Sequence, residues 1–293
     1  METMLKKVIA SLFIALMVTP TWSQTLVKVD YNTGAGTTVQ QVEAVFRPAK
    51  GAANGQALLI LHHGGGYSDN TTQQYAELYS SKGFATLELI MFRTRTPSTV
   101  IDPIAIHGQV MGGLQYLSQV PGVDRKKVSA MGMSMGAFLT INATSSWFYE
   151  KYGAGDLRFD KLIALYPVCW FMSEAMKGQT QDILIFKGLP NTFLQQSVEI
   201  PLLILAAGKD SYDTMDANAC PAFAKSIVNP RQAAMTKIVV YPNATHGWDH
   251  GKDYSFPLRG QCTGRTSCTN RIVSSPETVE QGKQAVLSFL TGQ

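Results

Sequence analysis

The sequence carries little charge, and the two signs nearly balance. Charged residues make up 16% of the 293 residues, and 25 lysines and arginines against 21 acidic residues leave a net charge of +4. The longest basic run is Arg125-Lys126-Lys127. Proteins that bind nucleic-acid phosphates need clustered lysine and arginine. The composition therefore argues against a nucleic-acid partner.

Long apolar runs are also lacking. The most apolar stretch, residues 8–18, is shorter than the roughly 20 residues that a membrane-spanning helix needs. Two lysines precede it, and residues 19–23 follow it with a proline and small residues. This order is typical of a secretory signal. We predict that residues 1–23 are a signal peptide cleaved after Ser23, and that the mature protein is secreted or periplasmic with no stable membrane anchor.

Only four cysteines are present, and an exported protein would hold them in an oxidising compartment. They are Cys169, Cys220, Cys262 and Cys268. Four cysteines allow three pairings, and the sequence leaves the choice open. No pair has the two- to four-residue spacing with a nearby histidine that is typical of zinc sites. We predict disulfides and no metal.

Internal repeats and linker-like shifts in composition are absent from the sequence, which favours one domain over residues 24–293. Apolar runs of strand length alternate with segments of helical spacing. Strands are predicted at residues 39–46, 57–61, 84–90, 128–131, 161–166, 201–206 and 236–241, and helices at 71–81, 104–120, from 137 onward, 219–228 and 278–290. Strands joined through helices form an α/β fold, a mostly parallel central sheet with helices on both faces. The long connection at residues 168–198 is predicted to be a lid or an extended crossover.

A candidate nucleophile follows the fourth predicted strand. Residues 132–136 read Gly-Met-Ser-Met-Gly, a G-x-S-x-G pattern between a strand and a helix. In a nucleophile elbow, the tight turn requires the flanking glycines and exposes the serine hydroxyl. Ser134 is therefore the candidate nucleophile. The alternative is a glycine-rich helix start with Ser134 as its N-cap.

An acid and a histidine follow two later strands. Asp210 comes just after the strand at 201–206, and His246 follows the strand at 236–241. The hydroxyl of Ser134 is too weakly acidic to attack unaided, so a histidine must accept its proton and an acid must fix the histidine tautomer. We predict that His246 is the base and Asp210 the acid.

Each of these two roles has a rival nearby. Asp213 and Asp216 lie slightly further along the acid loop, where capping a helix is the alternative role. His250 lies four residues after the predicted base and is otherwise an ordinary loop residue. The choice between Asp210 and Asp213 is left open by the sequence.

Taken together, the motifs at residues 61–66 (Leu-His-His-Gly-Gly-Gly), 132–136, 208–210 and 241–249 resemble the α/β-hydrolase superfamily. They are most similar to its dienelactone hydrolase-like branch, over about residues 40–290. The resemblance implies an α/β-hydrolase fold and hydrolysis of carboxylic esters or lactones without metal or organic cofactor. Classical members use a cysteine where this chain has Ser134, and they are usually cytoplasmic.

The resemblance also implies an oxyanion hole. In esterases with a similar His-Gly-Gly-Gly motif, the second and third glycines supply two of its amides, which map to Gly65 and Gly66. The third amide belongs to Met135, the residue after the nucleophile. The alternative is that the three glycines form a plain flexible turn.

Side chains near the strand ends are candidates for substrate binding. They are Tyr67, Arg93, Trp170 and Trp248. A guanidinium at Arg93 or Arg95 matches the geometry of a carboxylate, and its alternative role is a solvated loop charge. The two tryptophans either wall the pocket or pack in the core.

We therefore predict a serine hydrolase that cleaves a small-molecule or polymeric ester through an acyl-enzyme. One alternative is a prolyl-oligopeptidase-like peptidase, which shares the fold and the triad but usually carries an N-terminal propeller that this sequence lacks. Another is a non-catalytic binding protein with a hydrolase fold. The substrate and the oligomeric state are not determined by the sequence.

Overall fold

The computed structural model describes residues 24–34, 38–153 and 155–293, so the predicted signal peptide at 1–23 lies outside the described residues. The strands are β1 (Thr25–Asn32), β2 (Val39–Arg47), β3 (Ala57–Leu61), β4 (Ala85–Leu89), β5 (Val128–Met133), β6 (Leu162–Leu165), β7 (Leu202–Ala207), β8 (Thr236–Tyr241), β9 (Tyr254–Leu258) and β10 (Cys268–Ile272). The α-helices are α1 (Gln73–Ser81), α2 (Pro103–Ser118), α3 (Met135–Asn142), α4 (Ser146–Tyr152), α5 (Cys169–Met176), α6 (Ala219–Ser226), α7 (Pro230–Ala234) and α8 (Pro276–Thr291). Three single-turn 3-10 helices are η1 (Tyr67–Asp69), η2 (Leu184–Phe186) and η3 (Thr263–Arg265).

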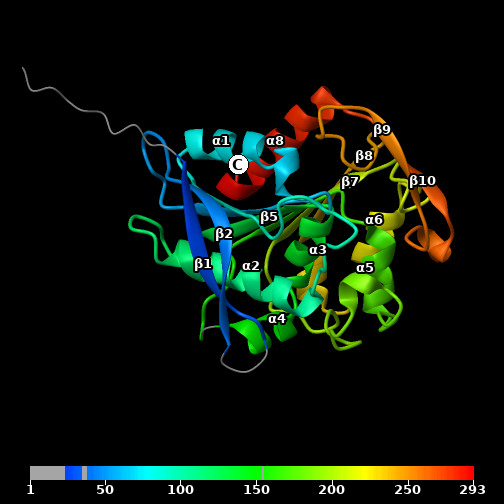
Figure 1. Ribbon diagram of the computed structural model, residues 1–293, viewed down its shortest axis with the longest axis horizontal. Coiled ribbons are helices and arrows are strands. Elements are labelled where there is room, and N and C mark those ends of the chain that lie inside the picture. Colours follow the sequence, from blue (N-terminus) through cyan, green and yellow to red (C-terminus); the bar gives the residue numbers. More distant parts are fainter. Residues whose placement is uncertain (1–23, 35–37, 154) are drawn as a thin grey trace, which may run out of the picture.

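Eight strands form one twisted sheet in the order β1-β2-β4-β3-β5-β6-β7-β8 (Figure 1). Neighbours from β4 to β8 pair in parallel, whereas β1 with β2 and β2 with β4 are antiparallel. Parallel strands bring their carboxyl ends to one edge, where the loops after β3, β5, β7 and β8 meet. The predicted mostly parallel α/β sheet is confirmed.

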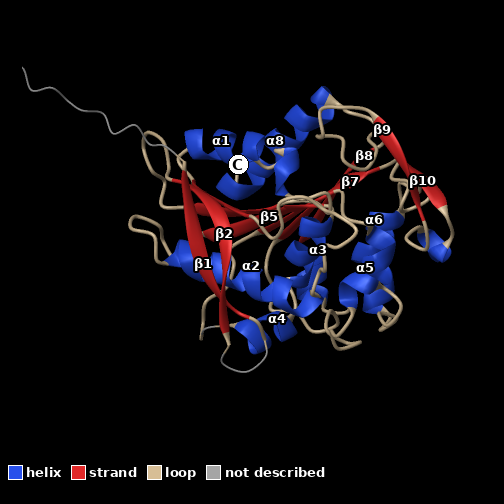
Figure 2. Ribbon diagram, viewed as in Figure 1, coloured by secondary structure: helices blue, strands red, loops and turns tan. Residues whose placement is uncertain are grey.

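Helices cover both faces of this sheet. Figure 2 shows α1 and α8 on one side and α2 to α5 on the other. Each face has its own apolar core, and side chains of one strand alternate between them: Leu59 and Leu61 of β3 enter one core, and Leu58 and Ile60 the other. Burying a side chain of this size stabilises the fold by roughly 1.5–3 kcal/mol relative to exposure. The continuous apolar runs of the central strands follow from burial on both faces.

The connection at residues 168–198 packs into the crossover from β6 to β7. It begins with α5, and its aromatic residues Phe186 and Phe193 are buried in the core that contains α3. The antiparallel edge strand β1 and the β9–β10 hairpin were not predicted, nor were the short helices α4 and α7. The hairpin lies at the β8 end of the molecule (Figure 1). No helix among the described residues has both the length and the apolarity needed to cross a membrane.

Candidate active site

Ser134 occupies a tight turn between β5 and α3. Its backbone has φ 51° and ψ −107°, and its amide donates to the carbonyl oxygen of Leu165 at 3.0 Å. A Cβ added to Gly132 would lie 2.0 Å from the carbonyl oxygen of Gly136, and one added to Gly136 would lie 2.3 Å from that of Leu61. Both glycines of the G-x-S-x-G pattern are thus required for steric reasons, as in a nucleophile elbow.

The structure brings the three predicted triad residues together. The Ser134 hydroxyl lies 2.7 Å from Nε2 of His246, and Nδ1 of His246 lies 2.7 Å from Oδ2 of Asp210. Both His246 and Asp210 are buried. A proton on Nδ1 donates to the carboxylate, which leaves Nε2 free to accept the proton of the serine hydroxyl. The second oxygen of Asp210 accepts the amide hydrogen of Tyr212 at 2.9 Å.

The rival acid and the rival base have other partners. The carboxylate of Asp213 accepts the amide hydrogens of Cys169 and Trp170 at 3.0 and 2.9 Å, at the start of α5. The pKa of Asp213 is raised to about 8, mainly because the carboxyl is buried and also because the carboxylate of Asp210 lies nearby. His250 pairs its Nδ1 with the hydroxyl of Tyr254 at 2.7 Å, and burial lowers its pKa to about 4.

Solved structures share this arrangement of strands and helices over nearly the whole chain. P91, a dienelactone hydrolase-like promiscuous phosphotriesterase from metagenomic libraries, matches with a TM-score of 0.59 and 13% identity, over 92% of this chain and 98% of its own. Esterase 2 of Thermogutta terrifontis, solved after modification by tabun, matches with a TM-score of 0.59 and 14% identity over 91% and 94%. The same esterase with butyrate bound matches with a TM-score of 0.56 and 12% identity over 90% and 94%.

The chain has the α/β-hydrolase fold. The fold expected from the motifs is therefore confirmed, and its structural neighbours include dienelactone hydrolase-like proteins. No family model matches the sequence. The uncharacterised protein YcjY of Escherichia coli K12 is 26% identical over 122 residues, so the match spans 40% of this chain and 40% of that relative.

The two glycine amides predicted for the oxyanion hole are bonded within their own turn. The amide of Gly65 donates to Nδ1 of His63 at 3.0 Å, and that of Gly66 donates to the carbonyl oxygen of His63 at 3.1 Å. The preceding glycine, Gly64, lines the cavity beside Ser134, and a Cβ placed on it would lie 3.9 Å from Cβ of Met135. The glycine motif therefore presents its first glycine, which the sequence analysis did not single out, next to Met135.

Two cavities adjoin Ser134 on the α/β-hydrolase scaffold. One has a volume of about 360 Å³ and the other of about 420 Å³. Both are lined by Gly64, Arg95, Ser134, Tyr212 and Gln261. The smaller cavity has apolar walls on one part of its lining and the charged side chains of Asp182 and Arg259 on another. The apolar walls come from Ile101, Met135, Phe138, Val168, Phe171, Ile183 and Ile185. The larger one contains His246 and is walled by the β9–β10 hairpin.

The four predicted substrate-binding residues do not line either cavity. Trp248 is fully buried against Tyr166, so it belongs to the core. The indole N–H of Trp170 donates to the carbonyl oxygen of Gln261 at 3.1 Å, behind the cavity wall.

Two of these predicted residues, Tyr67 and Arg93, point away from the cavities toward strand β2. Arg93 forms an ion pair with Glu43 of β2, and Tyr67 interacts with Arg47, so both side chains bond to residues of β2. Arg95, two residues further, lines both cavities. The charged side chain expected in the pocket is therefore Arg95, which the sequence had named only as the alternative to Arg93.

Asp249 is a buried carboxylate that the sequence analysis did not single out. It accepts hydrogen bonds from the hydroxyls of Tyr75 on α1, at 2.8 Å, and Tyr166 after β6, at 2.7 Å. The ring of Tyr166 packs edge-on against the ring of His246, with centroids 5.1 Å apart. Burial raises the pKa of Asp249 to about 6, although the two tyrosine hydroxyls oppose this shift. The network ties the loop that carries His246 to two other elements.

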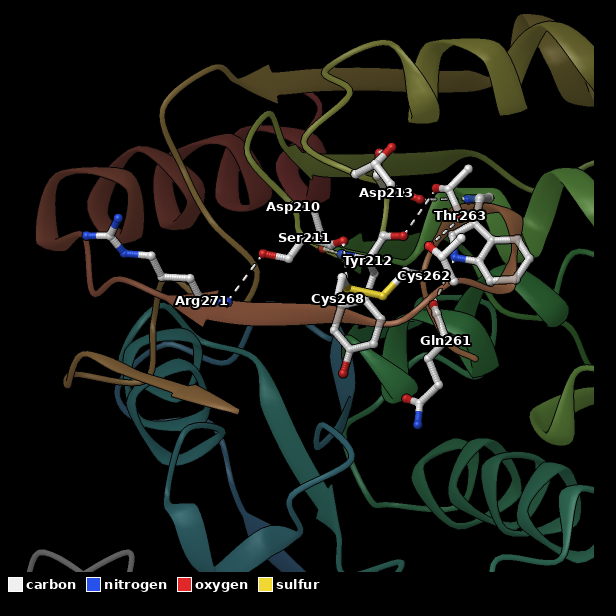
Figure 3. The surroundings of a disulfide bond; sticks show 12 residues. Asp210, Ser211, Tyr212, Asp213, Gln261, Cys262, Thr263, Cys268 and Arg271 are labelled. Carbon is white, nitrogen blue, oxygen red and sulfur yellow. Dashed lines mark hydrogen bonds between the residues drawn. A yellow bond between two sulfur atoms is a disulfide. The ribbon is translucent and has the colours of Figure 1, made fainter. Parts of the chain in front are cut away.

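The loop that carries Asp210 is held by the β9–β10 hairpin (Figure 3). The amide of Thr263 donates to the carbonyl oxygen of Tyr212 at 2.9 Å, and the amide of Arg271 donates to the hydroxyl of Ser211 at 3.3 Å. The disulfides are Cys169–Cys220 and Cys262–Cys268, one of the three possible pairings. Among the described residues, the cluster with metal-ligand spacing is Cys169, Asp213 and Cys220, and its two sulfurs are joined to each other.

Proposed function

We propose that this protein is a serine hydrolase that cleaves carboxylic esters, with Ser134 as nucleophile, His246 as general base and acid, and Asp210 as the acid that orients His246. The observation that carries the proposal is the continuous hydrogen-bonded chain from the hydroxyl of Ser134 to the buried carboxylate of Asp210, at the junction of two cavities. The esterases among the structural neighbours, one with butyrate bound, support an ester substrate.

The geometry provides for each step of the reaction. His246 Nε2 takes the proton of Ser134 while the serine oxygen forms a bond to the ester carbonyl carbon. Met135 offers its amide to the resulting oxyanion, because the first amides of a helix such as α3 have no partner within the helix. Gly64, which lines the cavity beside Met135, is the candidate for a second amide. The bond to the alcohol oxygen then breaks, and His246 gives that oxygen its proton. Water, activated by His246, then releases the carboxylic acid and restores Ser134.

The site favours Asp210 over Asp213 as the triad acid. Asp210 is bonded to His246, whereas both oxygens of Asp213 are occupied by the amides that begin α5. We further propose export as the setting of this reaction, because both pairs of cysteines are joined as disulfides, and disulfides persist mainly in oxidising compartments.

A fluorophosphonate probe tests the nucleophile, because it labels only activated serines. The wild-type protein is expected to be labelled and to hydrolyse short-chain esters, and Ser134→Ala is expected to do neither. Ser255→Ala, on the exposed face of β9, is the matched control and is expected to behave as wild type. Folded wild-type protein that takes no label, or label retained by Ser134→Ala, would contradict the proposal. Faster cleavage of matched amides than of esters would indicate a peptidase instead.

A pair of aspartate variants tests the acid. Asp210→Asn is expected to lower kcat by about 10⁴-fold, because the amide favours the wrong histidine tautomer. Asp213→Asn keeps an acceptor at the start of α5 and is expected to lower kcat by less than about 10-fold. Steady-state kinetics would measure both, with thermal unfolding to show that each variant is folded. A larger loss of kcat in Asp213→Asn than in Asp210→Asn would instead identify Asp213 as the triad acid.

A further inference from the structure

The two cavities divide the ester between them, provided that the proposed function holds. His246 returns its proton to the departing alcohol oxygen, so the alcohol must lie on the His246 side of Ser134. His246 lines the cavity of about 420 Å³, whereas the cavity of about 360 Å³ is lined by Met135 and not by His246. The larger cavity is thus the place for the alcohol and the smaller one the place for the acyl group.

One wall of the larger cavity is a row of flat rings. Tyr254 and Phe256 lie on the same face of β9, with ring centroids 6.0 Å apart and planes only 21° from parallel. The ring of His250 continues the row, 5.9 Å from Tyr254 at 23°. All three residues line the cavity, and both β9 rings are only half-buried. Because these rings stack on one another, they give this wall an aromatic surface against which the apolar face of a ring-shaped ligand can pack.

A second feature of this cavity is an amide without a partner. Asn270 lies on β10 directly opposite Phe256, lines the same cavity and is fully buried. Neither its Nδ2 nor its Oδ1 has a hydrogen-bond partner among the described residues. Leaving a buried amide unsatisfied costs free energy, so such groups require an explanation. A hydroxyl group both donates and accepts, so it complements an amide that lacks both kinds of partner.

We propose that this cavity binds a hydroxylated ring, the pyranose of a sugar ester, as the alcohol part of the substrate. The ring lies against Tyr254 and Phe256, and Asn270 turns its amide to a ring hydroxyl. Packing against the two aromatic rings would favour a benzyl group equally well. The unsatisfied amide of Asn270 is what favours a hydroxylated ring over a benzyl group. In the reaction, the bond between the acyl carbon and the sugar oxygen breaks. The sugar leaves with the proton from His246, and water supplies the new carboxylic acid.

The test compares acetate esters of four primary alcohols of similar reactivity. These are ethanol, cyclohexylmethanol, benzyl alcohol and the 6-hydroxyl of a methyl pyranoside. For the wild type, kcat/KM for the pyranoside ester is expected to exceed that for the ethyl ester at least tenfold. Asn270→Leu, which removes the amide at similar volume, is expected to lower this ratio at least tenfold. The control Thr269→Leu, on the outward face of β10, is expected to leave the ratio unchanged.

A second measurement does not depend on the variant's folding. Free methyl pyranoside is expected to act as a competitive inhibitor when the wild type hydrolyses the ethyl ester. An acyclic polyol of the same size is expected not to inhibit this reaction. A benzyl ester preferred over the pyranoside ester, or no inhibition by the pyranoside, would overturn the inference while fluorophosphonate labelling and ethyl ester cleavage persist. Loss of labelling and of all ester cleavage would instead refute the proposed function.

Discussion

At the scale of single residues, Asp249 shows how burial sets the charge state of a group near the site. Its carboxyl is buried, and among the described residues it bonds to the hydroxyls of Tyr75 and Tyr166 and to its own backbone amide rather than to a cation. Its pKa of about 6 exceeds the value near 3.9 expected in the unfolded chain. The folded protein therefore binds this proton more tightly than the unfolded chain, and stability falls as pH rises between about 4 and 6.

Asp249→Asn removes this dependence, because an amide carries no charge at any pH. The stability of the variant relative to wild type is expected to improve by about 2 kcal/mol between pH 4 and pH 7, which is most of the effect of a shift of about two pKa units. Urea unfolding at pH 4, 5.5 and 7 would measure it, with the exposed Asp253→Asn as control. A difference that is constant with pH would show that the carboxyl is not held neutral by burial.

At the scale of elements, the turn from β5 to α3 depends on close backbone contact. Gly132→Ala would place a methyl group 2.0 Å from the carbonyl oxygen of Gly136, so backbone must move. We expect a loss of at least about 3 kcal/mol of stability, which is typical of severe overpacking.

Gly282 of α8 is the matched control, since a Cβ there meets its first neighbour at 3.6 Å. Gly282→Ala is expected to stabilise by about 0.5–1 kcal/mol. Denaturant unfolding of both variants would measure this, and equal effects would contradict the account of the elbow.

At the scale of the whole molecule, each of the two disulfides contacts the acid loop. Cys220 lies in the first turn of α6, just after this loop, and is bonded to Cys169. Cys262–Cys268 closes the connection of the hairpin that contacts the loop (Figure 3). The bridges span 51 and 6 residues of sequence. Loop-closure entropy predicts a loss of about 4 kcal/mol for replacing the first pair by serine and about 2 kcal/mol for the second. Guanidinium unfolding of the two double variants would measure this order, and its reversal would show that local packing outweighs chain entropy.

Tertiary packing explains why the sequence did not predict some residues that line the cavities. Arg93 and Arg95 are chemically identical and two residues apart, and only the packing of their loop against β2 turns one to Glu43 and the other into the cavity. Trp248 follows a predicted catalytic residue closely, yet the fold places it in the core. Asn270 carries no sequence motif, and the role we propose for it depends on pairing with β9 across a hairpin that no local pattern indicated.

By itself, the sequence determined the α/β fold and pointed to Ser134 and His246, but it left the choice between two aspartates open. Strand periodicity, flanking glycines and chain order are local properties, because they depend on neighbours along the chain. Only the tertiary structure decided which glycine faces Met135, which arginine enters the cavity and which cysteines pair. These choices depend on contacts between segments far apart in sequence, where side-chain direction and strand register are settled by packing.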